Sequence, residues 1–238
     1  MWTRPRFDSN EDLVDSLVRR EALRNSKVEK AFRSVDRANF VDSEDRAESW
    51  SDAPHRNADT NLHLSAPHIY VTAAQALDLE EGLSFLNIGS GSGYFSAIVS
   101  TILGPTAISH GVEIRSNLVE FSRRATQNFL DTPLSSSSSS SSSNNRGDDD
   151  DEEEEEDTRK RRRRTSSCSS QSSVCAETRF FEGDIFKLNM ERNIKYDRIY
   201  VGAEAVRCML FLLLSIVSHI YILLTLAYSA SLVFETIL

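Results

Sequence analysis

The sequence LSFLNIGSGSG, residues 83–93, constrains the fold of this chain more than any other stretch. An apolar run leads into three alternating glycines, and the helix-like sequence YFSAIVSTIL follows at once. A buried strand that turns through glycines into a helix leaves backbone N–H groups uncapped, and these favour the polar or anionic part of a nucleotide-like ligand. The stretch therefore predicts a cofactor site. The alternative is an ordinary strand-to-helix turn.

The spacing of the glycines narrows the choice of cofactor. A dinucleotide-binding fingerprint needs a small residue three positions after its second glycine. In this chain the glycines are Gly89, Gly91 and Gly93, and the third position after Gly91 is the bulky Tyr94. A second apolar run, AISHGVEI, ends near Glu113, where the second strand of a doubly wound sheet places a carboxylate on ribose hydroxyls. The pattern favours a nucleoside cofactor other than NAD.

Hydrophobic periodicity predicts an α/β fold with a doubly wound, mostly parallel sheet and helices on both faces. Strands are expected at 83–88 and 107–112, with helices at 94–103 and 116–130. Two short helices are expected within 11–36, and Ser65 to Pro67 should cap and begin a further helix. The segments TRFFEGDIF and YDRIYVGA predict a third and a fourth strand.

The sheet pattern is interrupted by serine, acidic and basic runs between residues 132 and 176. Such runs cannot bury enough apolar area to offset their chain entropy, so we expect a disordered insertion. RKRRRR within it would alternatively be a nuclear-import or anionic-surface patch. The expected division is 1–131 and 177–204 for the two parts of one domain, 132–176 for the insertion and 205–238 for a hydrophobic C-terminal segment.

Residues 208–234 contain no Asp, Glu, Lys or Arg. This uncharged length exceeds the roughly 20 residues that cross a hydrocarbon core as a helix, so one hypothesis is a transmembrane helix that anchors a cytosolic domain. The alternatives are a buried helix and strands, or an unnatural chain ending that leaves the sheet unclosed.

Charge and cysteine content restrict the functions and the cellular compartments that the chain is expected to have. The net charge of −9 argues against a general nucleic-acid binder. Cys168, Cys175 and Cys208 show neither metal-ligand spacing nor a disulfide framework, so no metal site is expected and a reducing compartment fits best. The N-terminus lacks an apolar stretch of signal-peptide length. These observations predict a cytoplasmic protein.

The motifs LHLSAPHIY, LNIGSGSG, HGVEI, FEGDIF and YDRIYVGA, taken in this order, resemble those of the protein-L-isoaspartate O-methyltransferases, with the methyltransferase-domain-containing branch as the closest match. The resemblance covers about residues 11–134 and 178–203. It implies the Rossmann-like S-adenosylmethionine-dependent methyltransferase fold with its C-terminal strands missing or replaced, S-adenosylmethionine as cofactor, and isoaspartyl residues of damaged proteins as substrate. The helices within 11–36 would form a lid over the cofactor side.

The resemblance also assigns the site. The serine of its Ser-Ala-Pro-His motif corresponds to Ser65, the expected catalytic residue, for which a simple helix N-cap is the alternative. Asp184 would accept a hydrogen bond from the adenine amino group or cap its own turn. The full set of expected cofactor contacts is His63, Leu64, Ser65, Gly89, Ser90, Gly91, Ser92, Gly93, Glu113, Ile114, Asp184 and Ile185.

Three positions depart from the family pattern and put turnover in doubt. His63 replaces a threonine, Tyr70 a second histidine and Asn87 an aspartate. Two hypotheses follow: a protein carboxyl methyltransferase that repairs isoaspartyl proteins, and a catalytically weak or inactive cofactor-binding adaptor related to ubiquitin-ligase substrate receptors. The second would add ubiquitin-ligase components as partners.

Overall fold

A computed structural model describes residues 6–132, 174–185, 187 and 194–202, together with the backbone of two strands at 221–226 and 230–234. A six-stranded sheet forms its base, in the order β5-β4-β3-β6-β7-β8. All neighbouring strands are parallel except β7 and β8. The strands are β3 Phe85–Ile88, β4 Ser109–Glu113, β5 Thr178–Glu182, β6 Arg198–Val201, β7 Tyr221–Leu226 and β8 Ala230–Phe234. The prediction of a mostly parallel α/β sheet is confirmed.

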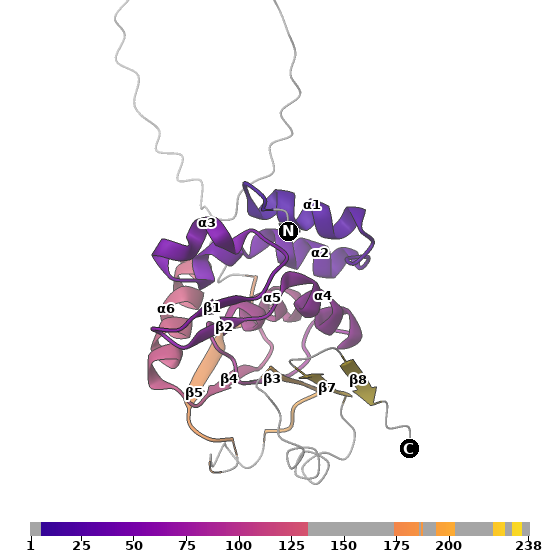
Figure 1. The fold of residues 1–238 in the computed structure, drawn as a ribbon. Coiled ribbons are helices and arrows are strands. Elements are labelled where there is room, and N and C mark those ends of the chain that lie inside the picture. The colour runs from indigo at the N-terminus through magenta and orange to yellow at the C-terminus, as the bar shows by residue number, and fades with distance from the viewer. Residues whose placement is uncertain are drawn as a thin grey trace, which may run out of the picture.

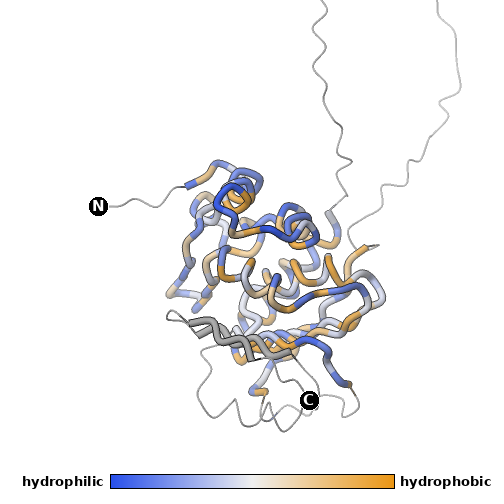
Figure 2. Tube along the Cα trace, turned by 90° about the vertical axis from the view of Figure 1, so that its right-hand side faces the viewer, coloured by the Kyte–Doolittle hydropathy of each residue, from blue (hydrophilic) through white to orange (hydrophobic). Residues whose placement is uncertain are grey.

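The described helices lie on one face of this sheet, as both views of the chain show (Figures 1 and 2). They are α1 Asn10–Arg19, α2 Ser26–Ser34, α3 Arg46–Ser49, α4 Pro67–Ala76, α5 Tyr94–Leu103 and α6 Ser116–Asp131, with single turns η1 Arg37–Phe40 and η2 Ser43–Asp45. The bounds predicted for α5 and α6 agree to within one residue, and the two short helices expected within 11–36 are α1 and α2. Helices were predicted on both faces of the sheet. Among the described residues, they occur on this face.

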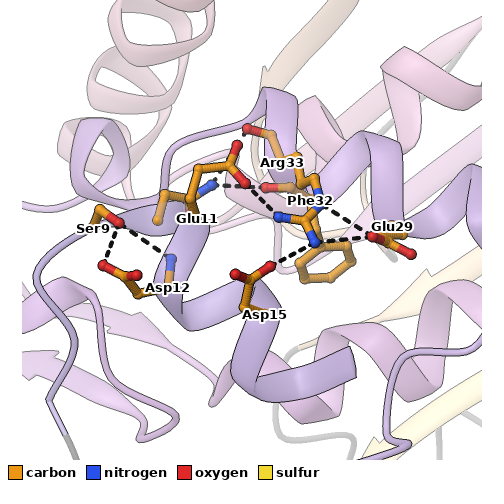
Figure 3. A network of polar contacts seen from close by, with 8 residues as sticks. Ser9, Glu11, Asp12, Asp15, Glu29, Phe32 and Arg33 are labelled. Atoms are coloured by element: carbon orange, nitrogen blue, oxygen red, sulfur yellow. Dashed lines mark hydrogen bonds and ion pairs between the residues drawn. The ribbon is translucent and has the colours of Figure 1, made fainter. Parts of the chain in front are cut away.

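Helices α1 and α2 form an antiparallel pair above α4 and α5 (Figure 1). The side chain of Ser9 caps α1 and that of Asn25 caps α2, each by accepting first-turn backbone N–H bonds. Arg33 on α2 joins the two helices by ion pairs to Glu11 and, at 2.8 Å, to Asp15 of α1, and it also pairs with Glu29 of its own helix at 2.9 Å (Figure 3). This network holds the helix pair together at its outer surface.

Apolar side chains on alternate positions of the strands form two clusters. Phe85 and Tyr200 face the helices and belong to the larger core, which extends to α1 and α2. Leu86, Ile88 and Val201 face the other side of the sheet and form a second, smaller cluster. The alternation is the period-two pattern of a strand buried on both faces.

The order of the strands reverses at β3, which has β4 on one side and β6 on the other. In open parallel sheets, the crevice at the carboxyl end of such a switch point is the usual ligand site. The glycine loop, residues 89–93, follows β3 at this point. A short hairpin of β1 His55–Asn57 and β2 Leu62–Leu64 leads into α4 nearby.

The structure corrects the prediction for the C-terminal segment. Residues 221–226 form β7 beside β6, and residues 230–234 form β8 beside β7. A transmembrane helix over 208–234 is therefore wrong for these residues, and the C-terminal strands that the resemblance placed in doubt are present, built from an apolar sequence. In the described part of the chain, no helix has the length and apolar character needed to cross a membrane.

The predicted insertion, 132–176, lies almost wholly outside the described residues. Its last residues do not fit the prediction, because Cys175 and Ala176 are buried and the Ala176 N–H donates to the Ser100 carbonyl at 3.0 Å. Burial also raises the pKa of the Cys175 thiol to about 11. The other domain boundaries stay predictions.

Candidate functional site

The glycine loop turns β3 into α5 through three left-handed residues. Gly89, Gly91 and Gly93 have φ angles of 74°, 55° and 85°, which side chains other than glycine adopt at a cost. The N–H groups of Gly89 and Ser90 both donate to the Val112 carbonyl, at 2.8 and 3.0 Å. The loop is therefore tied to the end of β4, the strand that carries Glu113.

The carboxylate of Glu113 closes this loop. Its Oε2 accepts from the Gly91 N–H at 3.0 Å, and its Oε1 accepts from the N–H groups of Ile114 and Arg115 at 2.9 and 3.1 Å. The residue is 6% exposed, whereas the neighbouring Ile114 is 63% exposed. An anchored acceptor thus stands beside an apolar side chain that faces solvent.

Asp184 follows β5, the strand that pairs with the strand of Glu113. The Gly183 N–H donates to the Glu113 carbonyl at 2.9 Å, so the residue that follows Gly183 is held at the end of β5. Lys187 approaches the Asp184 carboxylate at 3.9 Å. Ile185 packs against the apolar cluster of the second face.

The segment 63–65 approaches the loop from the hairpin. A Cβ added to Gly91 would lie 3.6 Å from the carbonyl oxygen of His63, so the two backbones are in near contact. The side chain of Leu64 is 1% exposed and belongs to the core. Partial burial and the charges of Arg56, Arg37 and His55 lower the pKa of His63, so its imidazole is neutral at pH 7.

Ser65 occupies a different position from the one predicted for a cap. The N-cap of α4 is Ala66, whose side chain makes no capping hydrogen bond, and Pro67 is the first helical residue. The Ser65 N–H donates to the Tyr70 hydroxyl at 3.1 Å. The Ser65 side chain is half-buried and is free of a capping bond, which removes the simple N-cap as its explanation.

Asp52 supplies the cap that Ser65 does not. Its Oδ1 accepts from the His68 N–H at 3.0 Å and lies 2.8 Å from His68 Nδ1, while Arg20 contacts its other oxygen at 3.0 Å. Burial by itself would raise the pKa of Asp52, but the hydrogen bonds from His68 and the charge of Arg20 lower it. A residue remote in sequence therefore holds the first turn of α4.

An aromatic cluster with one buried cation lies beneath Ser65, and sequence reasoning missed it. Tyr70 stacks on Phe95 with ring centroids 5.2 Å apart and meets Tyr94 edge-on at 5.6 Å. Arg37 is fully buried, with its Cζ 5.5 Å from the Tyr94 ring centroid. The aromatic residues recur on α4 and α5, but no sequence signal places Arg37 among them.

The structure thus brings Gly91, Glu113 and the His63 backbone together and leaves other predicted residues behind the loop. Ser92 Oγ accepts from the Tyr94 N–H at 3.4 Å, and Ser90 Oγ is buried without a hydrogen-bond partner among the described residues. The Asn87 amide donates to Ser96 Oγ at 2.9 Å, between sheet and helix. No group of three or more potential metal ligands occurs in the described part of the chain.

Comparison with known proteins gives a family match. The family model of protein-L-isoaspartate(D-aspartate) O-methyltransferase matches residues 8–136, more than half of the chain. A protein-L-isoaspartate O-methyltransferase of Methanothermobacter thermautotrophicus is 32% identical over 118 residues, 50% of this chain and 54% of its own length. Protein-L-isoaspartate O-methyltransferase 1 of Arabidopsis thaliana is 32% identical over 123 residues, which are 51% of this chain and 52% of that protein. The chain spans about half the length of these curated relatives.

Solved structures agree in fold. A protein-L-isoaspartate O-methyltransferase of Plasmodium falciparum, crystallised with S-adenosyl-L-homocysteine, superposes with a TM-score of 0.63 at 16% identity. The match covers 95% of this chain and 88% of that one. A second protein-L-isoaspartate O-methyltransferase gives a TM-score of 0.57 at 16% identity and covers 91% of this chain and 55% of its own. At this identity the likeness concerns the fold alone.

Proposed function

We propose that this chain, which belongs to the protein-L-isoaspartate(D-aspartate) O-methyltransferase family, methylates the side-chain carboxylate of isoaspartyl residues in damaged proteins. The observation that carries the proposal is the meeting of three segments at the switch point of the sheet. The Gly91 N–H donates to the Glu113 carboxylate, and a Cβ on Gly91 would lie 3.6 Å from the carbonyl oxygen of His63, two residues before Ser65. The cytoplasmic location stays a prediction.

S-Adenosylmethionine is the proposed cofactor, and the residues present fit it. The Glu113 carboxylate is an anchored acceptor suited to ribose hydroxyls, and hydrogen bonds to a charged acceptor are worth about 1.5–3 kcal/mol. Ile114 offers an exposed apolar side chain beside it, on which an adenine ring would lie. The glycines of the loop carry no side chains, so a ligand can approach the loop backbone closely. Asp184 follows Gly183, whose N–H donates to the Glu113 carbonyl.

When bound, the cofactor supplies an electrophilic methyl group, which a substrate carboxylate takes up while the carbon–sulfur bond breaks. The carboxylate is already a nucleophile, so the protein needs no general base and acts by positioning and by excluding water. Ser65 is suited to donate a hydrogen bond from its hydroxyl to this carboxylate. Its backbone is fixed by Tyr70 and its hydroxyl is not used as a cap.

Cofactor binding is the first test. Titration of the full chain with S-adenosylhomocysteine in a calorimeter should show one site, and Glu113→Ala should weaken binding by roughly tenfold or more, because a charge-assisted acceptor is lost. Glu182→Ala is the matched control, since Glu182 pairs with Glu113 in register but is exposed. Equal loss in both variants, or no binding by the wild type, would contradict the proposed site.

Methyl transfer is the second test. The protein, with labelled cofactor and an isoaspartyl peptide, should form a base-labile methyl ester. Ser65→Ala should lose this activity while it keeps its affinity for S-adenosylhomocysteine, and Ser34→Ala, at the far end of α2, should retain both. Cofactor binding without any ester in the wild type would favour the alternative of a binding module without turnover, to which the changes at His63, Tyr70 and Asn87 would then belong.

A further inference from the structure

The hydroxyl of Tyr70 has an unused donor beside Ser65. It accepts the Ser65 N–H at 3.1 Å, and no hydrogen bond donated by this hydroxyl occurs among the described residues. A tyrosine hydroxyl is both a donor and an acceptor, and a largely buried one normally satisfies both functions. Tyr70 is 8% exposed. Its proton is therefore available to a group that enters next to Ser65.

The ring of Tyr70 is held rigidly, which fixes the direction of this donor. It stacks on Phe95 at 5.2 Å, meets Tyr94 at 74° and lies 6.4 Å from the Tyr200 ring. Such packing leaves a two-torsion side chain little freedom, so its hydroxyl is placed before any ligand arrives. A preorganised donor loses little entropy on binding.

The charge near this hydroxyl is positive. Arg37 is fully buried, and its Nε and Nη1 atoms have no hydrogen-bond partner in the described part of the chain. Its Nη2 donates to the Ala53 carbonyl at 3.3 Å, and its charge interacts electrostatically with Tyr94, Tyr70 and the carboxylate of Asp52. Arg37 forms no ion pair within the described residues, and a buried cation in this situation favours an anion nearby, since the surrounding dielectric is low.

We propose that Tyr70 is a substrate-binding residue whose hydroxyl donates a hydrogen bond to the methyl-accepting carboxylate, alongside Ser65, in the positive potential of Arg37. The inference rests on the proposed function and deepens it. Tyr70 then has two roles at once: its oxygen holds the Ser65 backbone, and its proton holds the substrate. One side chain would couple the position of the serine to that of the carboxylate.

The test must separate these two roles. We compare two peptides of one sequence, one with an isoaspartyl residue and one with its neutral side-chain amide, in the presence of saturating S-adenosylhomocysteine, so that no turnover occurs. The ratio of their dissociation constants measures recognition of the carboxylate. Tyr70→Phe removes the hydroxyl and keeps the ring. Tyr196→Phe is the matched control, since it removes a phenolic hydroxyl that lies 2.6 Å from His110 Nδ1 on the other side of the sheet.

We expect Tyr70→Phe to reduce the preference for the carboxylate peptide by roughly tenfold, the loss of one charge-assisted hydrogen bond, and Tyr196→Phe to leave it within about twofold. We expect the same loss in a Ser65→Ala background, where a displaced serine hydroxyl cannot change the ratio. If Tyr70 served only the Ser65 backbone, Tyr70→Phe would leave the ratio constant in that background, which would overturn the inference alone. If the wild type bound both peptides equally, or neither, the proposed substrate would fail as well.

Discussion

At the residue scale, two glycines, Gly93 and Gly111, make room for the ring of Phe180 behind the glycine loop. A Cβ added to Gly111 would lie 2.6 Å from Cδ1 of Phe180, and one added to Gly93 would lie 3.0 Å from Cζ of the same ring. Phe180 is 4% exposed and is held between the two backbones. Packing at this point leaves no space for a methyl group on either glycine.

We therefore expect Gly111→Ala to lower the free energy of unfolding by about 1–3 kcal/mol, as overpacking does. Because the displaced ring also abuts Gly93, the affinity for S-adenosylhomocysteine should fall as well. Urea unfolding and calorimetry measure the two effects. A second variant, Phe180→Leu in the same chain, should recover part of the stability in a double-mutant cycle. Additive losses would show that the ring is not the obstacle.

Arg37 gives the opposite prediction for stability. Two of its buried nitrogens lack partners among the described residues, and an unsatisfied buried polar group costs about 1–3 kcal/mol. Arg37→Met keeps much of the packing volume without the charge, so we expect the thermal midpoint to stay constant or rise. The preference for a carboxylate peptide should nevertheless fall. A loss of stability above about 1 kcal/mol would mean that Arg37 is a structural cation.

At the scale of single elements, helix α4 depends on a residue outside it. The first turn of the helix places its His68 N–H on the Asp52 carboxylate, whereas Ser65 and Ala66 supply no side-chain cap. Favourable interaction of an anion with a helix N-terminus adds to this bond. The position of Ser65 thus depends on the loop before β1.

Asp52→Ala should lower the free energy of unfolding at pH 7 by about 1–2 kcal/mol, the usual cost of a lost cap. The pKa of Asp52 in the folded protein is lower than its unfolded value of about 3.9. Its charged form therefore stabilises the fold above about pH 4, and this contribution disappears as the pH falls through the lowered pKa.

Unfolding by urea at several pH values measures the difference between wild type and Asp52→Ala, which should shrink on acidification. Asp59→Ala is the control, since Asp59 is exposed on the hairpin. A difference that stayed constant with pH would attribute the loss to packing instead of to the carboxylate.

At the scale of the whole molecule, the C-terminal strands protect the sheet. β6 carries the buried residues Ile199, Tyr200 and Val201 and pairs in parallel with β7, which pairs in turn with β8. Without these strands β6 would be an open, apolar edge, and such edges promote association.

A chain that ends at residue 204 should therefore associate or unfold at a lower temperature than the full chain. Size-exclusion chromatography and thermal unfolding measure this. Leu223→Pro should act in the same direction, because residue 223 lies opposite Tyr200 in a strand with neighbours on both sides, and proline removes a ladder N–H. Leu223→Ala retains that N–H and serves as control. Unchanged behaviour of the truncated chain would show that β6 is stable as an edge.

Local patterns alone predicted much of this architecture. The succession of apolar strand, glycine turn, apolar helix and second apolar strand in residues 83–113 predicted β3, α5 and β4. A glycine turn between an apolar strand and an apolar helix allows few other arrangements. Glu113 could be placed at the end of its strand for the same reason. An uncharged segment was harder to assign, since a run of apolar residues suits a membrane helix and a buried strand alike. The pairing of residues 221–226 with β6, and of residues 230–234 with 221–226, shows that both segments are strands.

Contacts between residues distant in sequence required the tertiary structure. Asp52 on His68, Arg37 beside Tyr94 and the Tyr70 hydroxyl on Ser65 follow from how the hairpin and helices pack, and no local signal encodes them. The sequence by itself determined the glycine loop and the position of Glu113 beside it, because backbone conformation there depends on glycine. The tertiary structure alone decided what surrounds Ser65, because burial and charge depend on neighbours brought together by the fold.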